Sequence, residues 1–258
     1  MAYLQLIGMV HVGPLPGSPR YQPPCGTTVR RAVEDAAKLE QAGFDAVLIE
    51  NYGDVPYFPD DVPDTTVAAL ARVVTATRAT VDLPVGVNVL RNDAIAALSI
   101  AAACEAQFIR VNVLSGTMYT DQGPIQGRAA DLARLRASIG PRIEVLADVF
   151  VKHATPPPGL RIEEAAADLW HRAMADGLIL SGRATGSPTD PETIDRVRAA
   201  VPGARLLVGS GVTSRQVRGL VGRVDGAIVG TAIKQMGDIH RPVDISRAAT
   251  LVRAARPA

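Results

Sequence analysis

Short apolar runs alternate with longer stretches of helical spacing along the whole chain. Each run suits a strand buried on both faces, and each longer stretch has apolar residues three and four apart. The pattern predicts eight strands, at Leu4–Val10, Ala46–Glu50, Val85–Leu90, Phe108–Val113, Ile143–Val149, Gly177–Leu180, Leu206–Val208 and Gly226–Val229. It predicts helices at Thr28–Ala42, Thr65–Thr80, Asp93–Glu105, Arg128–Ile139, Ile162–Asp176, Pro191–Ala200 and Ile245–Ala255, with one more after Gly211.

Strict alternation of strands and helices predicts a parallel α/β sheet, and eight such units predict a closed ring. The 258 residues are close to the roughly 250 that are typical of a (β/α)₈ TIM barrel. We therefore expect a single TIM-barrel domain over residues 1–258. The alternative is a doubly wound open sheet, which normally carries a GxGxxG fingerprint after its first strand, whereas this strand ends in Val10-His11.

Composition narrows the class of protein. Hydrophobic residues make up 47% of the chain but aromatic residues only 4%, which predicts an aliphatic core. The net charge of +1 and the absence of a basic run argue against a nucleic-acid partner. No apolar run is long enough for a transmembrane segment, and the start reads directly into a strand instead of a signal peptide. We expect a cytoplasmic protein, and the sequence leaves open whether it forms a homo-oligomer.

Two glycine-rich turns near the end of the chain predict an anion site. Apolar runs lead into Gly209-Ser210-Gly211 and then into Gly230-Thr231. In (β/α)₈ barrels the loops after the seventh and eighth strands commonly bind phosphate, since glycine lets backbone N–H groups approach an anion. Phosphate binding is therefore expected at Gly209, Ser210, Gly211, Gly230 and Thr231, although such glycines can also serve only to make tight turns.

Polar residues at the ends of buried strands are the candidates for chemistry, because a strand covered on both faces has little use for them. A carboxylate at a strand end, followed by a cation and an imidazole, supplies groups for proton transfer. We expect catalytic roles for Asp148, Lys152, His153, Glu50 and His11, with Asp148 emerging at the rim of the barrel. Substrate contacts are expected from Asn51, Asn88, Arg110, Asn112, Ser181 and Thr185.

Structural roles compete with these assignments. His11 could hydrogen-bond a loop carbonyl, and Glu50 with Arg110 could form a buried ion pair that is not catalytic. A divalent metal on His11, Glu50, Asp148 and His153 is a weaker alternative, since no two of them have tight ligand spacing. The two cysteines, Cys25 and Cys104, have neither metal nor redox spacing. No metal ligand is therefore assigned.

Several long motifs resemble those of the BtpA family, the group that also includes SgcQ. They are GMVHVGPLPGSP at 8–19, LEQAGFDAVLIENYGDVP at 39–56, PVGVNVLRND at 84–93, FIRVNVLSG at 108–116, ADVFVKH at 147–153, and LLVGSGVT and GAIVGTAIK near the end. This family is similar to phosphate-binding barrels of the ribulose-phosphate type. The resemblance implies a ligand that is a sugar phosphate or phosphorylated nucleoside, but it supplies no reaction.

Two functions follow as hypotheses. The first is an enzyme that acts by acid/base chemistry on a phosphorylated small metabolite, as an isomerase, a lyase or a glycosyl-cleaving enzyme. The second, implied by the family name, is a non-enzymatic assembly or stability factor for a membrane protein complex of the photosystem I type. A binding factor predicts an apolar patch on the outer helices, and the helical stretches show no conspicuous apolar stripe.

Overall fold

A closed barrel of eight parallel strands is the centre of the molecule in the computed structural model, which describes residues 3–182 and 188–256. Around the barrel the strand order is β1-β11-β10-β9-β7-β4-β3-β2. The predicted TIM barrel is thus confirmed. Its strands are β1 Gln5–His11, β2 Ala46–Glu50, β3 Val85–Asn88, β4 Phe108–Val111, β7 Glu144–Asp148, β9 Gly177–Leu180, β10 Leu206–Val208 and β11 Gly226–Val229.

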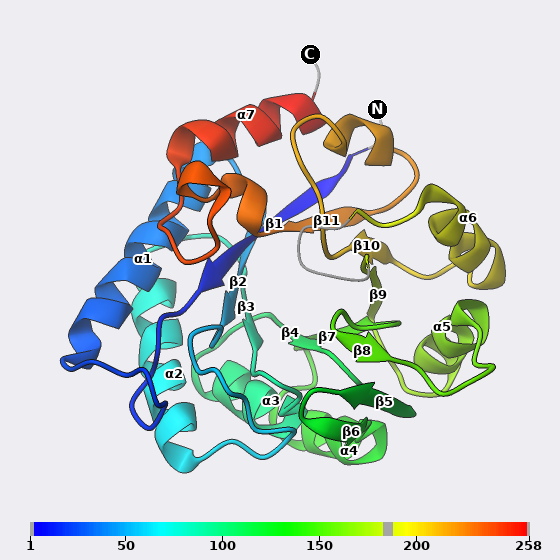
Figure 1. The fold of residues 1–258 in the computed structure, drawn as a ribbon, viewed down its shortest axis with the longest axis horizontal. Helices are drawn as coiled ribbons and strands as arrows, with labels where there is room; N and C mark the ends of the chain where they lie inside the picture. The colour runs from blue at the N-terminus through cyan, green and yellow to red at the C-terminus, as the bar shows by residue number, and fades with distance from the viewer. Residues whose placement is uncertain (1–2, 183–187, 257–258) are drawn as a thin grey trace.

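The α-helices form an outer ring around these strands (Figure 1). Asp190 and Asp244 start two of them, each side chain accepting a hydrogen bond from a backbone N–H of the first turn. Gly43 ends the first in the left-handed region, at φ 90°. In the described residues the helices are α1 Cys25–Ala42, α2 Asp64–Arg78, α3 Ala94–Ala103, α4 Ala129–Ile139, α5 Ile162–His171, α6 Pro191–Ala200 and α7 Ile245–Ala255.

The prediction of an α-helix after Gly211 is wrong. The segment between β10 and β11 contains only a short 3₁₀ helix, η1 at Val217–Leu220. Gly219 and Gly222 interrupt this segment, and Gly222 has a φ of 82°, which an α-helix cannot include. The loop after β11 also begins with a 3₁₀ turn, η2 at Thr231–Ile233. Both glycine-rich turns therefore run into 3₁₀ turns instead of α-helices.

A small antiparallel sheet that the hydrophobic pattern does not predict lies beyond the carboxyl ends of β4 and β7. Its strands are β5 Thr117–Thr120, β6 Gly123–Gln126 and β8 Ala154–Thr155, in the order β6-β5-β8. Figure 1 shows these three strands side by side, next to α4 and α5. The pairing of Thr120 with Ala154 joins the loop after β4 to the loop after β7.

Two apolar layers stabilise the barrel. Along β1, the side chains of Leu6 and Val10 pack against the helices, whereas Ile7 and Met9 point into the barrel, as the two-residue period of a strand requires. The inner layer is aliphatic except for Phe108, which lies over Gly86: a Cβ there would be 2.1 Å from the ring. The remaining inner residues are Ala46, Leu48, Leu146, Ile179, Leu207 and Ile228.

A buried ion pair ties the end of the barrel to its beginning. Nζ of Lys234, just after η2, lies 2.8 Å from a carboxylate oxygen of Asp35 on α1, and both side chains are almost fully buried. The other oxygen of Asp35 accepts a 2.7 Å hydrogen bond from the backbone N–H of Val243. One carboxylate thus holds both ends of the loop from Lys234 to Val243 against α1.

Replacing Phe108 by Ala should destabilise the protein by about 3–5 kcal/mol, because it empties the centre of the inner layer. Urea unfolding followed by circular dichroism measures this change. Phe58→Ala is the control, since that ring is 53% exposed and its loss should cost within about 0.5 kcal/mol. Equal effects of the two substitutions would contradict the packing described for Phe108.

Candidate functional site

A cavity of about 280 Å³ opens at the carboxyl end of the barrel, where barrels of this type carry their chemistry. We call it the mouth cavity. Residues from both ends of the sequence meet there: the ends of β1 and β2 form one side and the loops after β10 and β11 the other. Its lining includes nine of the residues expected from sequence, which are His11, Glu50, Arg110, Lys152, Gly209, Ser210, Gly211, Gly230 and Thr231.

Asp148 lies at the centre of a buried hydrogen-bond network, not at the rim. Its carboxylate forms a bidentate pair with Arg110, with Nε–Oδ2 and Nη2–Oδ1 distances both of 2.9 Å. Asn112 Nδ2 donates to Oδ2 at 3.2 Å, and the Ser181 hydroxyl donates to Oδ1 at 3.3 Å. The carboxylate therefore receives four donors, which fills its acceptor capacity, and its side chain is fully buried. We call these four residues the carboxylate hub.

The hub keeps Arg110 charged. Burial alone would lower the pKa of Arg110, but the charge and hydrogen bonds of Asp148 more than offset this and raise it. Asn88 extends the network, since its Nδ2 donates to Asn112 Oδ1 at 3.0 Å and to the Arg110 carbonyl at 3.1 Å. Arg110 thus presents a fixed positive charge to the mouth cavity.

His11 and Glu50 lie side by side in the mouth cavity. His11 Nε2 is 3.9 Å from Glu50 Oε1, and both side chains are more than 90% buried. Burial lowers the pKa of His11 well below its ordinary 6.5, and the charges of Lys234 and Lys152 lower it further. Burial raises the pKa of Glu50, which nearby Arg110 opposes only in part. The site thus favours a neutral imidazole beside a carboxyl group that holds its proton unusually well.

Lys152 supplies a third titratable group. Burial and the charge of Arg110 lower the pKa of its amine, and the carboxylates of Glu50 and Asp148 oppose the shift. Its carbonyl accepts a 2.6 Å hydrogen bond from Arg91 Nη2. The next residue, His153, has a φ of 55° and does not line the mouth cavity. The structure thus brings Lys152, but not His153, to the cavity.

The glycine loops, residues 209–213 and 230–232, form the neighbouring wall, because β11 lies next to β1 in the barrel. Gly211 has a φ of 67°, a left-handed conformation that L side chains rarely adopt. Gly230 lies against His11: a Cβ there would be 3.0 Å from the imidazole carbon Cε1. Among the residues that the structure describes, the backbone N–H groups of Gly211, Val212 and Thr231 have no hydrogen-bond acceptor. The loops that line the cavity therefore include three backbone donors without an acceptor.

Other expected residues lie elsewhere. Asn51 does not line the mouth cavity: it donates to Asp54 at 3.1 Å and accepts from the Leu90 N–H at 2.7 Å, so it joins the loops after β2 and β3. Asn88, Asn112, Asp148 and Ser181 belong to the network beneath the cavity. Thr185 lies outside the described residues. Within residues 3–182 and 188–256, no three His, Cys, Asp or Glu side chains are grouped as a metal site would require, and Cys25 and Cys104 are free thiols.

The lining residues that the sequence did not indicate include Tyr52 and Arg247. Tyr52 follows Asn51 in a polar loop, and its ring meets His11 edge-on at 5.0 Å between centroids. An aromatic residue in such a loop was a usable signal. Arg247 comes from α7, and its Nε donates to the Ala232 carbonyl at 3.0 Å, next to the glycine loops. Nothing local in the sequence distinguishes Arg247 from the other arginines on the outer helices.

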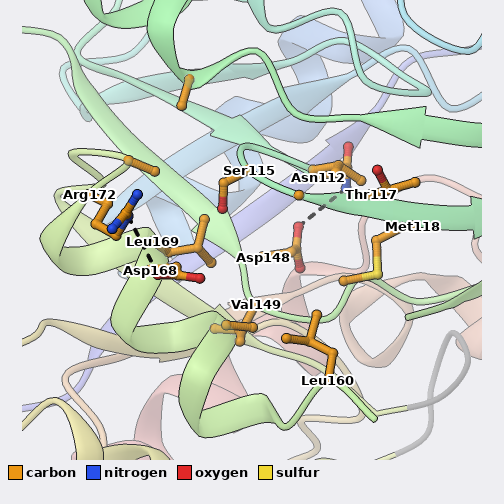
Figure 2. A pocket seen from close by; sticks show the side chains of 15 residues that line it. Asn112, Ser115, Thr117, Met118, Asp148, Val149, Leu160, Asp168, Leu169 and Arg172 are labelled. Carbon is orange, nitrogen blue, oxygen red and sulfur yellow. Dashed lines mark hydrogen bonds and ion pairs between the residues drawn. The ribbon is translucent and has the colours of Figure 1, made fainter. Parts of the chain in front are cut away.

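A second cavity, of about 200 Å³, lies between α5 and the carboxyl ends of β4 and β7 (Figure 2). Leu169, Val149, Leu160 and Met118 make much of its wall. Its charged side chains are already paired: Asp148 is held in the carboxylate hub, and Asp168 lies 3.8 Å from Arg172. The mouth cavity, where acid/base groups face available donors, is the better candidate for a functional site.

The BtpA family model matches residues 3–257. An uncharacterised protein of Thermococcus kodakarensis is 49% identical over 97% of this chain and 95% of its own. The photosystem I biogenesis protein BtpA of Synechocystis is 39% identical over 96% of this chain and 87% of its own. The sgc region protein SgcQ of Escherichia coli is 29% identical, with 94% and 90% covered.

Solved structures show the same fold at low sequence identity. Tryptophan synthase of Mycobacterium tuberculosis superposes with a TM-score of 0.66 and 19% identity, over 99% of this chain and 94% of that one. Phosphoribosyl anthranilate isomerase of Thermus thermophilus has a TM-score of 0.60 and 11% identity, over 97% and 98%. In the described part of the present chain, no helix is long and apolar enough to cross a membrane.

Asp148→Asn should destabilise the protein by about 3–5 kcal/mol, because it turns an amide N–H₂ towards Arg110 and leaves that buried cation without a counter-charge. Urea unfolding at neutral pH measures the change. Asp168→Asn is the control: its carboxylate is largely exposed, and its loss should cost within about 0.5 kcal/mol. An Asp148→Asn variant as stable as wild type would show that the hub does not hold Arg110.

Glu50→Gln should stabilise the protein increasingly as the pH rises above 4.5, the ordinary pKa of the group. Because the native pKa is raised, the native state binds more protons than the unfolded state between the two pKa values. The stability of the wild type therefore falls as the pH rises through that interval. Glutamine does not titrate, so the variant escapes this loss.

Urea unfolding at pH values from about 4 to about 8 covers the interval in which the two proteins should diverge. Glu34→Gln, on the exposed face of α1, is the control and should show no such trend. A difference between Glu50→Gln and wild type that stays constant with pH would contradict the raised pKa of Glu50.

Proposed function

Because this chain belongs to the BtpA family and has a TIM-barrel fold, we propose that it is an enzyme acting on a phosphorylated small metabolite in the mouth cavity. One observation carries the proposal: the glycine loops, with backbone donors that have no acceptor, line the same cavity as a neutral imidazole and a buried carboxyl group. An anion held by these loops would place the rest of the molecule near the acid/base groups.

The phosphate group would bind to the glycine loops. The backbone N–H groups of Gly211, Val212 and Thr231 are directed donors, and Arg247 adds positive charge next to them. This proposal rests on backbone donors and a cation. A cavity of about 280 Å³ suits a metabolite of the size of a sugar phosphate.

His11 and Glu50 would carry the proton transfers. A general base needs a free lone pair near neutral pH, which a neutral imidazole has, and a general acid needs a proton, which a carboxyl group with a raised pKa such as Glu50 holds more readily than an exposed one. Asp148 is the weaker candidate for proton transfer because four donors occupy its carboxylate. We assign it the role of holding Arg110, whose charge would stabilise a developing enolate or alkoxide.

Isomerase, lyase and glycosyl-cleaving reactions all use an opposed acid and base. The other hypothesis, a non-enzymatic assembly factor, is favoured by the name of the Synechocystis relative. It gives no role to a carboxyl group and an imidazole buried beside available donors. The enzyme is therefore the function that the cavity supports better.

Inorganic phosphate should bind to the wild type, and Gly211→Val should abolish binding because it forces a β-branched residue into a left-handed conformation. Isothermal titration calorimetry measures the affinity. Gly116→Val is a matched control: Gly116 has a φ of 68° but lies outside the mouth cavity, with no atom within 4 Å of the position that a Cβ would take. It should carry the same backbone strain and still bind phosphate. Unchanged binding by Gly211→Val would place the anion elsewhere.

A further inference from the structure

Lys152 has an amine with no obvious structural task. The chain contains only three lysines, Lys38, Lys152 and Lys234. Lys234 is paired with Asp35, and Lys38 lies half-buried on α1, away from the mouth cavity. The Lys152 amine reaches the mouth cavity, and within the described ranges 3–182 and 188–256 no hydrogen bond or close ion pair involves it.

The surroundings of this amine lower its pKa, so that it gives up its proton more readily than an exposed lysine does. A largely buried ammonium group without a close partner is costly, and the positive charges of Arg110 and Arg91 add to that cost. A lysine in such a place reacts as an amine nucleophile, since the neutral lone pair is what attacks a carbonyl carbon. Glu50 and His11 line the same cavity, so they are placed to donate and accept the protons that such an attack requires.

Three contacts fix the backbone around Lys152. Val151 is buried against Met118 and Ile125 of the small sheet. Ala154 pairs with Thr120 of β5. Arg91 Nη2 holds the carbonyl of Lys152 itself at 2.6 Å. The long side chain therefore starts from a rigid base, which limits the space that the amine can reach and directs it into the mouth cavity.

We propose that Lys152 forms a covalent imine with the carbonyl carbon of a phosphorylated aldehyde or ketone whose phosphate is held by the glycine loops. This inference rests on the proposed function and narrows its substrate class to carbonyl compounds. It also narrows the reaction to those that an imine assists, in which a carbanion next to the former carbonyl carbon is stabilised by the positively charged nitrogen.

The step balances with the groups present. The Nζ lone pair attacks the carbonyl carbon, a C–N bond forms, and the C=O π electrons move to oxygen. Nitrogen loses a proton to His11 and oxygen gains one from Glu50, which gives a carbinolamine. The proton on His11 then passes to the hydroxyl group, which leaves as water, and the nitrogen lone pair closes the C=N bond. The products are a protonated imine and water, with no oxidant or reductant.

Trapping with sodium borohydride tests this step, because hydride reduces the imine to a stable secondary amine. The full-length wild type is incubated with dihydroxyacetone phosphate, reduced and mapped by peptide mass spectrometry. The adduct should form on Lys152 in preference to Lys38 and Lys234 by at least about tenfold, a small part of what positioning can contribute. Lys152→Met should remove it, and Lys38→Arg should leave it unchanged.

Competition separates this inference from the proposed function on which it rests. Excess inorganic phosphate should suppress labelling of Lys152, and unphosphorylated dihydroxyacetone should label it poorly. If phosphate binds but Lys152 is not labelled, the imine is overturned and the phosphate site stands. If Lys38 is labelled as strongly as Lys152, the imine is also overturned. If dihydroxyacetone labels Lys152 as well as its phosphate does, the imine stands and the phosphate site fails.

Discussion

The buried pair of Arg110 and Asp148 is the interaction on which the carboxyl half of the barrel depends. Neither ion can be removed alone, because the partner would remain charged and desolvated. Asn112 and Ser181 complete the coordination of the carboxylate, so strands β4, β7 and the end of β9 are joined by polar contacts where the apolar inner layer ends. The hub thus forms a rigid floor under the mouth cavity.

The charge of Arg110 in the carboxylate hub also shifts the pKa values of side chains that line the mouth cavity. Arg110 satisfies Asp148 and still acts on Glu50, Lys152 and His11. Its charge favours an ionised Glu50, but burial outweighs it, so the pKa of Glu50 is raised while the pKa values of His11 and Lys152 fall. This one buried cation therefore helps to lower the pKa values of His11 and Lys152, while it limits the rise in the pKa of Glu50. Such shifts are typical of functional sites, although structural networks also produce them.

The hydrophobic pattern predicts the barrel because burial on both faces leaves little freedom in choosing strand residues. Even the short strand Leu206–Val208 is recognisable, since its three apolar residues lie between the turn residues Pro202-Gly203 and Gly209. The small sheet was missed because Thr117–Thr120 and Gly123–Gln126 are short, largely polar and include Pro124. The helix after Gly211 was wrong because the apolar residues of Val217–Leu220 have helical spacing over too short a segment to overcome its glycines.

Strand ends and the glycine turns that follow them identified half of the cavity lining, since the carboxyl ends of parallel strands meet at one face. What the sequence could not show is how each side chain is engaged. The sequence did not show that the Asp148 carboxylate is paired, because its partner Arg110 lies 38 residues earlier. Pairing at that distance depends on the register of β4 against β7. Arg247 was missed because only the closed ring brings α7 next to the glycine loops.

Ring closure has a consequence for how the chain is made. β1 forms hydrogen bonds with β11, and Asp35 reaches Lys234 across 199 residues, so the first strand has only one neighbour until almost the whole chain has been synthesised. Meanwhile β1 offers an unpaired edge to other chains. The mouth cavity is also completed last, because His11 ends β1, Gly230 follows β11, and these two strands pair last. An incomplete chain therefore exposes a strand edge that can pair with other chains before the cavity is complete.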